Sequence, residues 1–164
     1  MSRMTPMTYY DVFVIRNLDD YEEMPHDIRR GMNASVSAFQ LADVTLEYYW
    51  KHDPSKLDPW QNNKELLLKD LCKREPAFLT VQSVATAYKH LYTRDSRNVV
   101  YEIESGGALT SFHAPDDDVE MDSDWSNDAS DVIVLRRDGS RASLRGALKS
   151  VVHDLWPKIL PPEY

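Results

Sequence analysis

The stretch that decides the fold is "PHDIRRGMNASVSAFQLADVTLEYYWK", residues 25–51. Apolar side chains recur in it every three or four residues, which is the spacing of one face of an α-helix. This stripe consists of Ile28, Met32, Val36, Phe39, Leu46 and Trp50. Gly31 weakens the helix by up to ~1 kcal/mol relative to alanine, and packing of the stripe can offset that cost. The spacing therefore predicts one long helix over about residues 25–51.

Two further helices are expected directly after this one. The segment "HDPSKLDPW" (52–60) contains two prolines and predicts a loop, because proline disfavours helix in the residue before it. A second helix is expected over "WQNNKELLLKDLCKRE" (60–75), and Pro76 ends it. A third is expected from Phe78 to about Thr93. Before the long helix, residues 8–22 fit either a strand or a helix, and we favour the helix.

The pattern changes after the third helix. The run "NVVYEIE" (98–104) alternates and is rich in β-branched and aromatic residues, which predicts a strand. In "DVIVLRRDGSRASL" (131–144), two short runs flank Asp138-Gly139, a strong hairpin signal. Residues 143–156 return to helical spacing, and Pro157 is expected to close that last helix. The predicted fold class is α+β, mainly α: a helical bundle with a small antiparallel β element and a C-terminal helix.

Length and composition favour one domain over residues 1–164, with a helical core at about 26–95 and 143–157 and a β element and acidic loop at 98–142. The single cysteine, Cys72, cannot form an intramolecular disulfide, which favours the cytoplasm. No segment approaches the ~20 apolar residues that span a bilayer, so no membrane association is expected. Nucleotide-binding, hydrolase and metal motifs do not occur, and the histidines are scattered, so we expect no cofactor and no metal.

The net charge of −8 is concentrated in one segment, because residues 98–135 carry ten acidic side chains and no basic one. We expect residues 105–131 to form a long solvated loop. The alternative is a surface that imitates the phosphate spacing of nucleic acid or binds a basic partner. Its candidate residues are Asp116, Asp117, Asp118, Glu120, Asp122 and Asp124. An acidic balance argues against broad binding of a phosphate backbone but leaves a local basic patch open.

Lys89 and His90 are candidate site residues in the third predicted helix. Helical projection places Lys89 at one flank of the apolar face and His90 nearly opposite, near Ser83 and Thr86. One interpretation is a solvated polar face. The other is a face that meets a cleft or a second subunit, where His90 could transfer a proton and Lys89 could hold a phosphate or a carboxylate.

Asp43 is the third candidate, because it lies on the apolar stripe of the long helix between Phe39 and Leu46. A buried carboxylate needs a hydrogen-bonded cation or must take up a proton. We therefore expect Asp43 to contact Lys89 or His90. The alternative is that Asp43 lies at the edge of the stripe, where it reaches water or caps a neighbouring helix.

The three candidate residues also belong to a sequence pattern that is similar to that of a known family. The pattern Ala-x-x-Leu-x-Asp followed by Lys-His resembles a family of uncharacterised bacterial and phage-associated helical proteins. The matching positions are Asn33, Ala38, Leu41, Asp43, Lys89 and His90. The chain departs from the family pattern at Gln40, where members tend to have histidine, at Val44 (tryptophan) and at Thr86 (asparagine). The resemblance covers residues 26–95 and implies a helical fold without an established activity.

That architecture is in turn similar to the HEPN superfamily of helical bundles, many of which are metal-independent ribonucleases. Their site places an arginine before a histidine, with four to six residues between the two. The corresponding positions before His90 are Ser83, Val84 and Ala85, so the arginine is missing. We therefore expect a non-enzymatic interaction or regulatory protein of a bacterial or mobile-element system, with a protein partner or a second copy of the chain. The alternatives are a HEPN-like ribonuclease that uses His90 and an acidic inhibitor that mimics nucleic acid.

Overall fold

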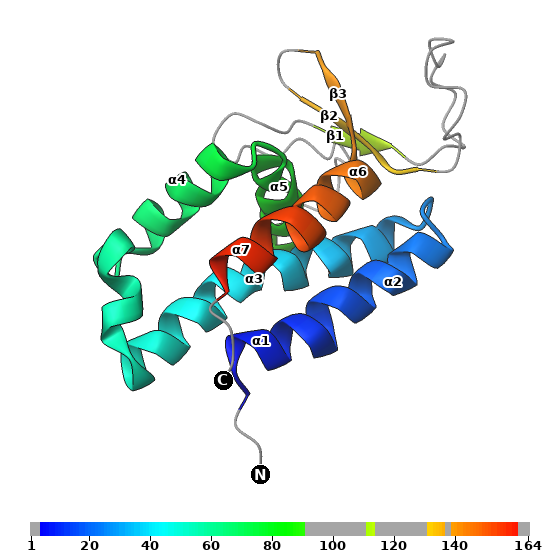
Figure 1. The fold of residues 1–164 in the computed structure, drawn as a ribbon. Helices are drawn as coiled ribbons and strands as arrows, with labels where there is room; N and C mark the ends of the chain where they lie inside the picture. The colour runs from blue at the N-terminus through cyan, green and yellow to red at the C-terminus, as the bar shows by residue number, and fades with distance from the viewer. Residues whose placement is uncertain (1–3, 91–110, 114–130, 137–138, 161–164) are drawn as a thin grey trace.

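The computed structural model describes residues 4–90, 111–113, 131–136 and 139–160, and it shows a mainly helical α+β fold (Figure 1). Helix α3, Ile28–His52, packs against helices from both ends of the chain. A small antiparallel sheet lies at one end of the helical part, and a C-terminal helix follows it. The predicted fold class is confirmed.

The N-terminal segment is helical from residue 6 to residue 23, so the favoured interpretation of residues 8–22 is confirmed. It consists of α1 (Pro6–Tyr9), the π-helical turn η1 (Tyr10–Ile15) and α2 (Arg16–Glu23), which follow one another without a break. Thr5 starts the segment, because its side chain accepts a hydrogen bond from the Thr8 N–H at 3.1 Å.

Among the described residues, no helix is both long enough and apolar enough to cross a membrane.

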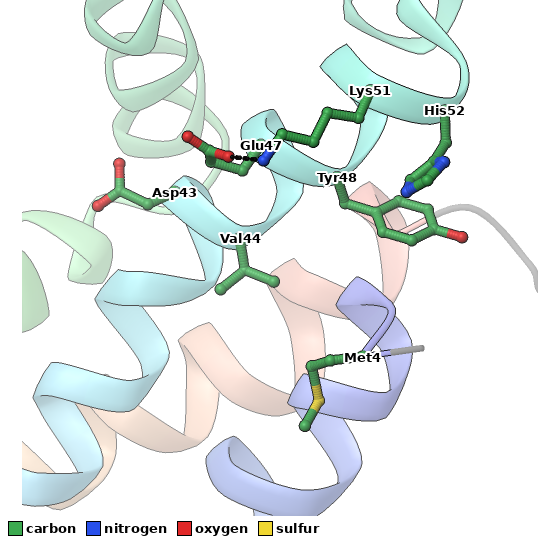
Figure 2. A pocket seen from close by; sticks show the side chains of 7 residues that line it. All are labelled: Met4, Asp43, Val44, Glu47, Tyr48, Lys51 and His52. Carbon is green, nitrogen blue, oxygen red and sulfur yellow. Dashed lines mark hydrogen bonds and ion pairs between the residues drawn. The ribbon is translucent and has the colours of Figure 1, made fainter. Parts of the chain in front are cut away.

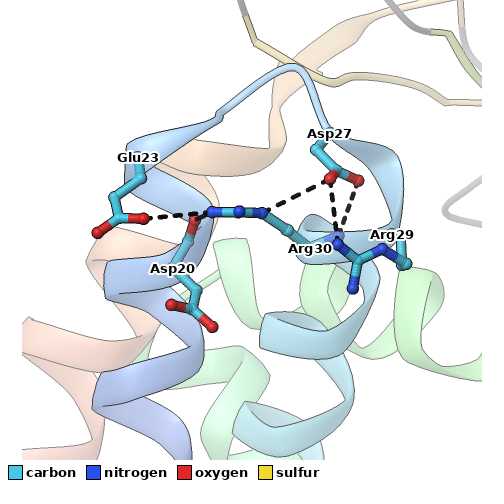
Figure 3. Close-up of polar contacts among 5 residues, drawn as sticks. All are labelled: Asp20, Glu23, Asp27, Arg29 and Arg30. Atoms are coloured by element: carbon cyan, nitrogen blue, oxygen red, sulfur yellow. Dashed lines mark hydrogen bonds and ion pairs between the residues drawn. The ribbon is translucent and has the colours of Figure 1, made fainter.

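A charged cluster joins α2 to the start of α3 (Figure 3). The Arg30 guanidinium donates to the Asp20 carbonyl at 2.7 Å and to the Glu23 carboxylate at 3.4 Å. Asp27 caps α3 by accepting a hydrogen bond from the Arg30 N–H at 3.2 Å. One arginine therefore fixes the end of α2 against the first turn of α3.

The buried face of α3 differs from the predicted stripe. It is built mainly of small side chains: Gly31, Met32, Ala34, Ser35, Ser37, Ala38, Leu41, Ala42 and Thr45. Trp50, predicted to be buried, is 57% exposed. The physical reason is that α3 has neighbours on several sides, and small residues let their backbones approach closely. The buried hydroxyls of Ser35 and Thr45 donate to carbonyls one turn earlier, at 2.8 and 2.6 Å.

A 3-10 helix, η2 (Pro54–Trp60), occupies the predicted loop after α3. The next helix, α4 (Lys64–Arg74), begins four residues later than predicted, because Asn63 caps it with a hydrogen bond from the Glu65 N–H at 2.8 Å. Helix α5 (Ala77–His90) confirms the third predicted helix up to the last described residue of that segment.

The sheet contains β1 (Ser111–His113), β2 (Ile133–Leu135) and β3 (Arg141–Ser143) in that order, all antiparallel. The predicted hairpin over 131–144 is confirmed, and Gly139 adopts the φ of +82° that its turn needs. The expectation of a loop throughout 105–131 is wrong at β1, which pairs with β2. The strand predicted near 98–104 lies outside the described residues.

The C-terminal helix runs through α6 (Leu144–Lys149), the π-helical turn η4 (Ser150–Leu155) and α7 (Trp156–Ile159). Pro157 does not end it as predicted, because Pro157 lies in the first turn of α7, where an N–H donor is not needed. Two long-range hydrogen bonds hold this helix in the bundle. Trp156 donates to the Ala38 carbonyl at 3.1 Å, and the Tyr10 hydroxyl donates to the Val152 carbonyl in η4 at 2.9 Å.

Candidate functional site

Asp43 is paired with a lysine that the sequence did not suggest. Its carboxylate lies 2.6 Å from the Nζ of Lys64, the first residue of α4. Both side chains are close to half exposed, and Lys64 also lies over the ring of Phe39, 5.4 Å from its centroid. The expectation that Asp43 lies in a buried stripe is therefore wrong. The alternative, a carboxylate at the edge of the stripe, describes its position.

Lys89 and His90 belong to the last turn of α5, and their side chains lie outside the described residues. The expected contact between Asp43 and either of them therefore stays a prediction. The polar side of α5 is not a solvated face along its whole length, because Ser83 and Thr80 are buried. Arg136, which follows β2, donates to the Thr80 hydroxyl at 3.1 Å.

The acidic candidates are not placed by the structure. Asp116, Asp117, Asp118, Glu120, Asp122 and Asp124 all lie outside the described residues, so their role as a partner-binding surface stays a prediction. The described ranges contain 15 basic and 15 acidic residues, Lys89 included. The whole excess of negative charge therefore belongs to the rest of the chain.

The structure shows a hollow that the sequence did not indicate, between Met4, two residues before α1, and the C-terminal half of α3 (Figure 2). We call it the α3 groove; its volume is about 470 Å³. Its lining residues are Met4, Asp43, Val44, Glu47, Tyr48, Lys51 and His52. Met4 lies opposite the side chains that α3 contributes. The groove is open to solvent, and Met4 is 48% exposed.

The α3 side of the groove carries two neighbouring rows of side chains, one with Asp43, Glu47 and Lys51 and one with Val44, Tyr48 and His52. The Tyr48 ring packs on the His52 ring with their centroids 4.6 Å apart. Glu47 and Lys51, one turn apart, form an ion pair at 2.7 Å. The helical spacing of four residues explains both contacts, because residues i and i+4 are neighbours on a helix surface. That spacing was the available signal in the sequence, but it could not show that this face is left uncovered.

A second polar cluster is buried and joins α2, β2 and α6. Asp131 is 2% exposed, and its carboxylate accepts hydrogen bonds from Tyr21 (2.9 Å), Ser143 and the Arg145 N–H (3.3 Å). Burial raises the pKa of Asp131, although the hydrogen bonds from Ser143 and Tyr21 oppose the shift. Burial and the nearby Asp131 carboxylate also raise the pKa of Tyr21. We interpret this cluster as structural, because the carboxylate caps the start of α6.

Glu22 extends this cluster toward the surface. Its carboxylate forms ion pairs with Lys149 at 2.8 Å and with Arg145 at 3.5 Å. The hydrogen bond with Lys149 lowers the pKa of Glu22. The pairing of Arg145 with Glu22 connects it to α2, which the sequence could not show.

The α3 groove and the Asp131 cluster have different chemical capacities. The groove presents a thioether, an aromatic ring and exposed charges to solvent, which suits binding of another side chain. In the Asp131 cluster the hydrogen-bonding groups are satisfied by one another. Within the ranges that the structure describes, no three His, Cys, Asp or Glu side chains are grouped so that they could hold a metal ion.

Comparisons with protein-family models, with curated proteins and with solved structures give no match to this chain.

Proposed function

We propose that the chain is a non-enzymatic interaction or regulatory protein of a bacterial or mobile-element system, and that it binds a protein partner through the α3 groove. The observation that supports this is the groove itself, where Met4 and Tyr48 lie at an open surface beside exposed charges. Methionine and aromatic side chains are enriched in protein interfaces relative to the rest of the surface. Trp50, on the same half of α3, adds a further exposed aromatic side chain.

The charges around the groove are compatible with exchange of partners. The Glu47–Lys51 and Asp43–Lys64 pairs both lie at the surface, and such pairs contribute ~0–1 kcal/mol each. A protein that brings its own charges can therefore replace them at little cost. A partner can then use the apolar part of the groove for affinity and the charged part for orientation.

Photo-crosslinking in the host cell tests this proposal. A crosslinking amino acid at Tyr48 should give a defined adduct, whereas the same group at Lys69, exposed on α4, should not. Absence of an adduct at Tyr48 would overturn binding at the groove. The mass of the adduct also shows whether the partner is a second copy or a different protein.

An RNA-cleavage assay separates this proposal from the HEPN-like ribonuclease. Wild type, His90→Ala and His153→Ala are compared on the same RNA, and His153 serves as the control because it is exposed on η4. We expect the three proteins to give equal, background cleavage. Cleavage lost only in His90→Ala would overturn the non-enzymatic role, since contamination would not respond to the substitution.

A second candidate, an acidic protein that mimics nucleic acid, is favoured by the equal numbers of acidic and basic residues in the described ranges. The test measures whether the chain displaces DNA from polylysine. Replacement of Asp116, Asp117 and Asp118 by asparagine should weaken the displacement if this candidate is correct. Equal displacement by wild type and the variant would argue against it.

A further inference from the structure

We infer that the partner of the α3 groove is a second copy of this chain, related by a two-fold axis that passes beside α3, next to Tyr48. The inference rests on the proposed function, because it names the occupant of the same groove. Its support is the order of the charges along α3, together with the apolar side chains between them.

The charges are arranged so that the groove is complementary to itself. Asp43 and Glu47 lie toward the start of the face, and Lys51 follows Glu47 by one helical turn. A two-fold axis perpendicular to α3 reverses the direction of the second copy. The acidic part of each copy then faces the basic part of the other. Glu47 of each copy meets Lys51 of the other copy, so each such pair occurs twice.

An aromatic side chain lies where such an axis would pass, because Tyr48 lies between Glu47 and Lys51 on α3. Val44 and Tyr48 are on α3, and Met4 lies across the groove from them (Figure 2). A partner placed by the axis brings its Tyr48 close to Tyr48 of the first copy, and Val44 lies about one helical turn away along α3. The apolar contact supplies affinity, and the charge order sets the antiparallel direction.

The Glu47–Lys51 ion pair within each copy does not prevent these residues from pairing with the other copy. Glu47 and Lys51 form their ion pair on a surface where their side chains are 71% and 64% exposed. Exposed intrahelical pairs contribute little to stability, so they exchange readily for pairs between copies. Association therefore replaces one exposed pair in each copy by two pairs across the interface, which the partner shields from water.

Charge reversal tests the inference by sedimentation equilibrium over a wide concentration range. Wild type should dimerise. Glu47→Lys alone and Lys51→Glu alone should each weaken the dimer about 10- to 100-fold, because each places like charges opposite each other twice. An equimolar mixture of the two variants should recover wild-type affinity as a heterodimer, since each lysine then meets a glutamate. High salt should reduce the differences among these proteins.

Arg74→Glu is the matched control. Arg74 belongs to another exposed i,i+4 pair, with Asp70 on α4, and its reversal should leave the dimer unchanged. Circular dichroism should show equal helix content in all variants, because the substituted side chains are exposed.

Three results would overturn the inference: a wild type that is monomeric throughout, charge reversals without effect on the dimer, or a mixture that does not recover. A crosslinked adduct of a different mass at Tyr48 together with a monomeric wild type would leave the interaction role standing and assign the groove to another protein. Cleavage that depends on His90 would overturn the interaction role whatever the state of association.

Discussion

Replacing Asp131 by alanine should destabilise the fold more than replacing any exposed carboxylate. The buried carboxylate accepts hydrogen bonds from the Tyr21 hydroxyl, the Ser143 hydroxyl and the Arg145 N–H. These donors belong to α2, to the end of β3 and to the start of α6. The substitution therefore removes one acceptor that three elements share.

The magnitude follows from what each donor loses. Tyr21 is fully buried, so its unpaired hydroxyl costs about 1–3 kcal/mol. Ser143 and Arg145 are partly accessible to water, so we assign about 0.5–1 kcal/mol to each of their lost bonds. The alanine variant no longer buries the charged Asp131 carboxylate, and the free energy gained in this way offsets part of the sum. We expect a net loss of about 2–4 kcal/mol, which lowers Tm by roughly 5–15 °C for a chain of this size.

Urea denaturation followed by circular dichroism measures the effect. Asp131→Asn should lose less than Asp131→Ala, because the amide oxygen still accepts a hydrogen bond. Asp154→Ala, an exposed position on η4, should stay within about 0.5 kcal/mol of wild type. In a double-mutant cycle with Tyr21→Phe, we expect coupling of at least about 0.5 kcal/mol. A loss below about 0.5 kcal/mol for Asp131→Ala, or strict additivity, would refute the reasoning.

The Asp131 carboxyl should also make the free energy of unfolding depend on pH. Burial raises the pKa of Asp131 above its ordinary value of 3.8, so the folded chain holds this proton more tightly than the unfolded chain. The free energy of unfolding therefore falls as pH rises from the ordinary value through the raised one. Glu22, whose pKa is lowered, acts in the opposite direction but is common to wild type and Asp131→Asn. The stability of wild type minus that of Asp131→Asn should decline with rising pH, and a flat or rising difference would contradict the assigned shift.

Two further substitutions and one deletion probe other parts of the chain. Gly31→Ala should lose about 0.5–2 kcal/mol in a denaturant melt despite its better helix propensity, because the new Cβ would lie 2.9 Å from Leu144 Cδ2 and 3.1 Å from the buried Tyr21 ring. Asn33→Ala, exposed on the same helix, is its control, and a stabilised Gly31→Ala would show that the ring can move. Asp43→Asn should change stability by less than about 1 kcal/mol, because its pair with Lys64 is half exposed; a larger loss in the same melts would indicate a further partner. Deletion of residues 116–128 should leave Tm nearly unchanged in a calorimetric scan, and a large decrease would mean that this segment packs or binds an ion.

The sequence located the helices well and the buried face of α3 poorly. Periodicity of apolar residues marks where a helix lies, which is why the bounds of α3 and the start of α5 were predictable. It weights large side chains such as Trp50, however, and gives little weight to Ala34, Ala38 and Ala42. These alanines are buried because neighbouring helices approach α3 closely, a property of the assembled bundle.

The hairpin was predictable because its signal is local. Asp138-Gly139 specifies a tight turn, and Gly139 adopts the positive φ that such a turn needs. The partner of Asp43 was not predictable in the same way. Lys64 is 21 residues away, and its position depends on Gln61 and Asn62, which adopt positive φ values of 50° and 52° before α4. The periodicity of apolar residues does not indicate that the chain turns at these two residues.

Asp131 had no signal at all in the sequence, since it closes an acidic run and looked like the other carboxylates there. The α3 groove could not be predicted from the sequence either. Its residues follow helical spacing, but whether another element covers that face depends on where the N-terminal segment lies. Met4 reaches the groove from a position some 40 residues earlier in the chain than the α3 residues that it faces.

The pairing of β1 with β2 has a consequence for engineering. His113 is the register partner of Ile133, so the chain leaves the sheet and re-enters it at adjacent points. Sequence inserted between His113 and Asp131 therefore lengthens a connection whose ends the sheet already holds together. The entropy of loop closure grows only logarithmically, by about 0.6 kcal/mol for each doubling of length. Such an insertion leaves the buried Asp131 and Val132 in place, so this connection is suited to carry an inserted reporter domain or new chain termini in a circular permutant.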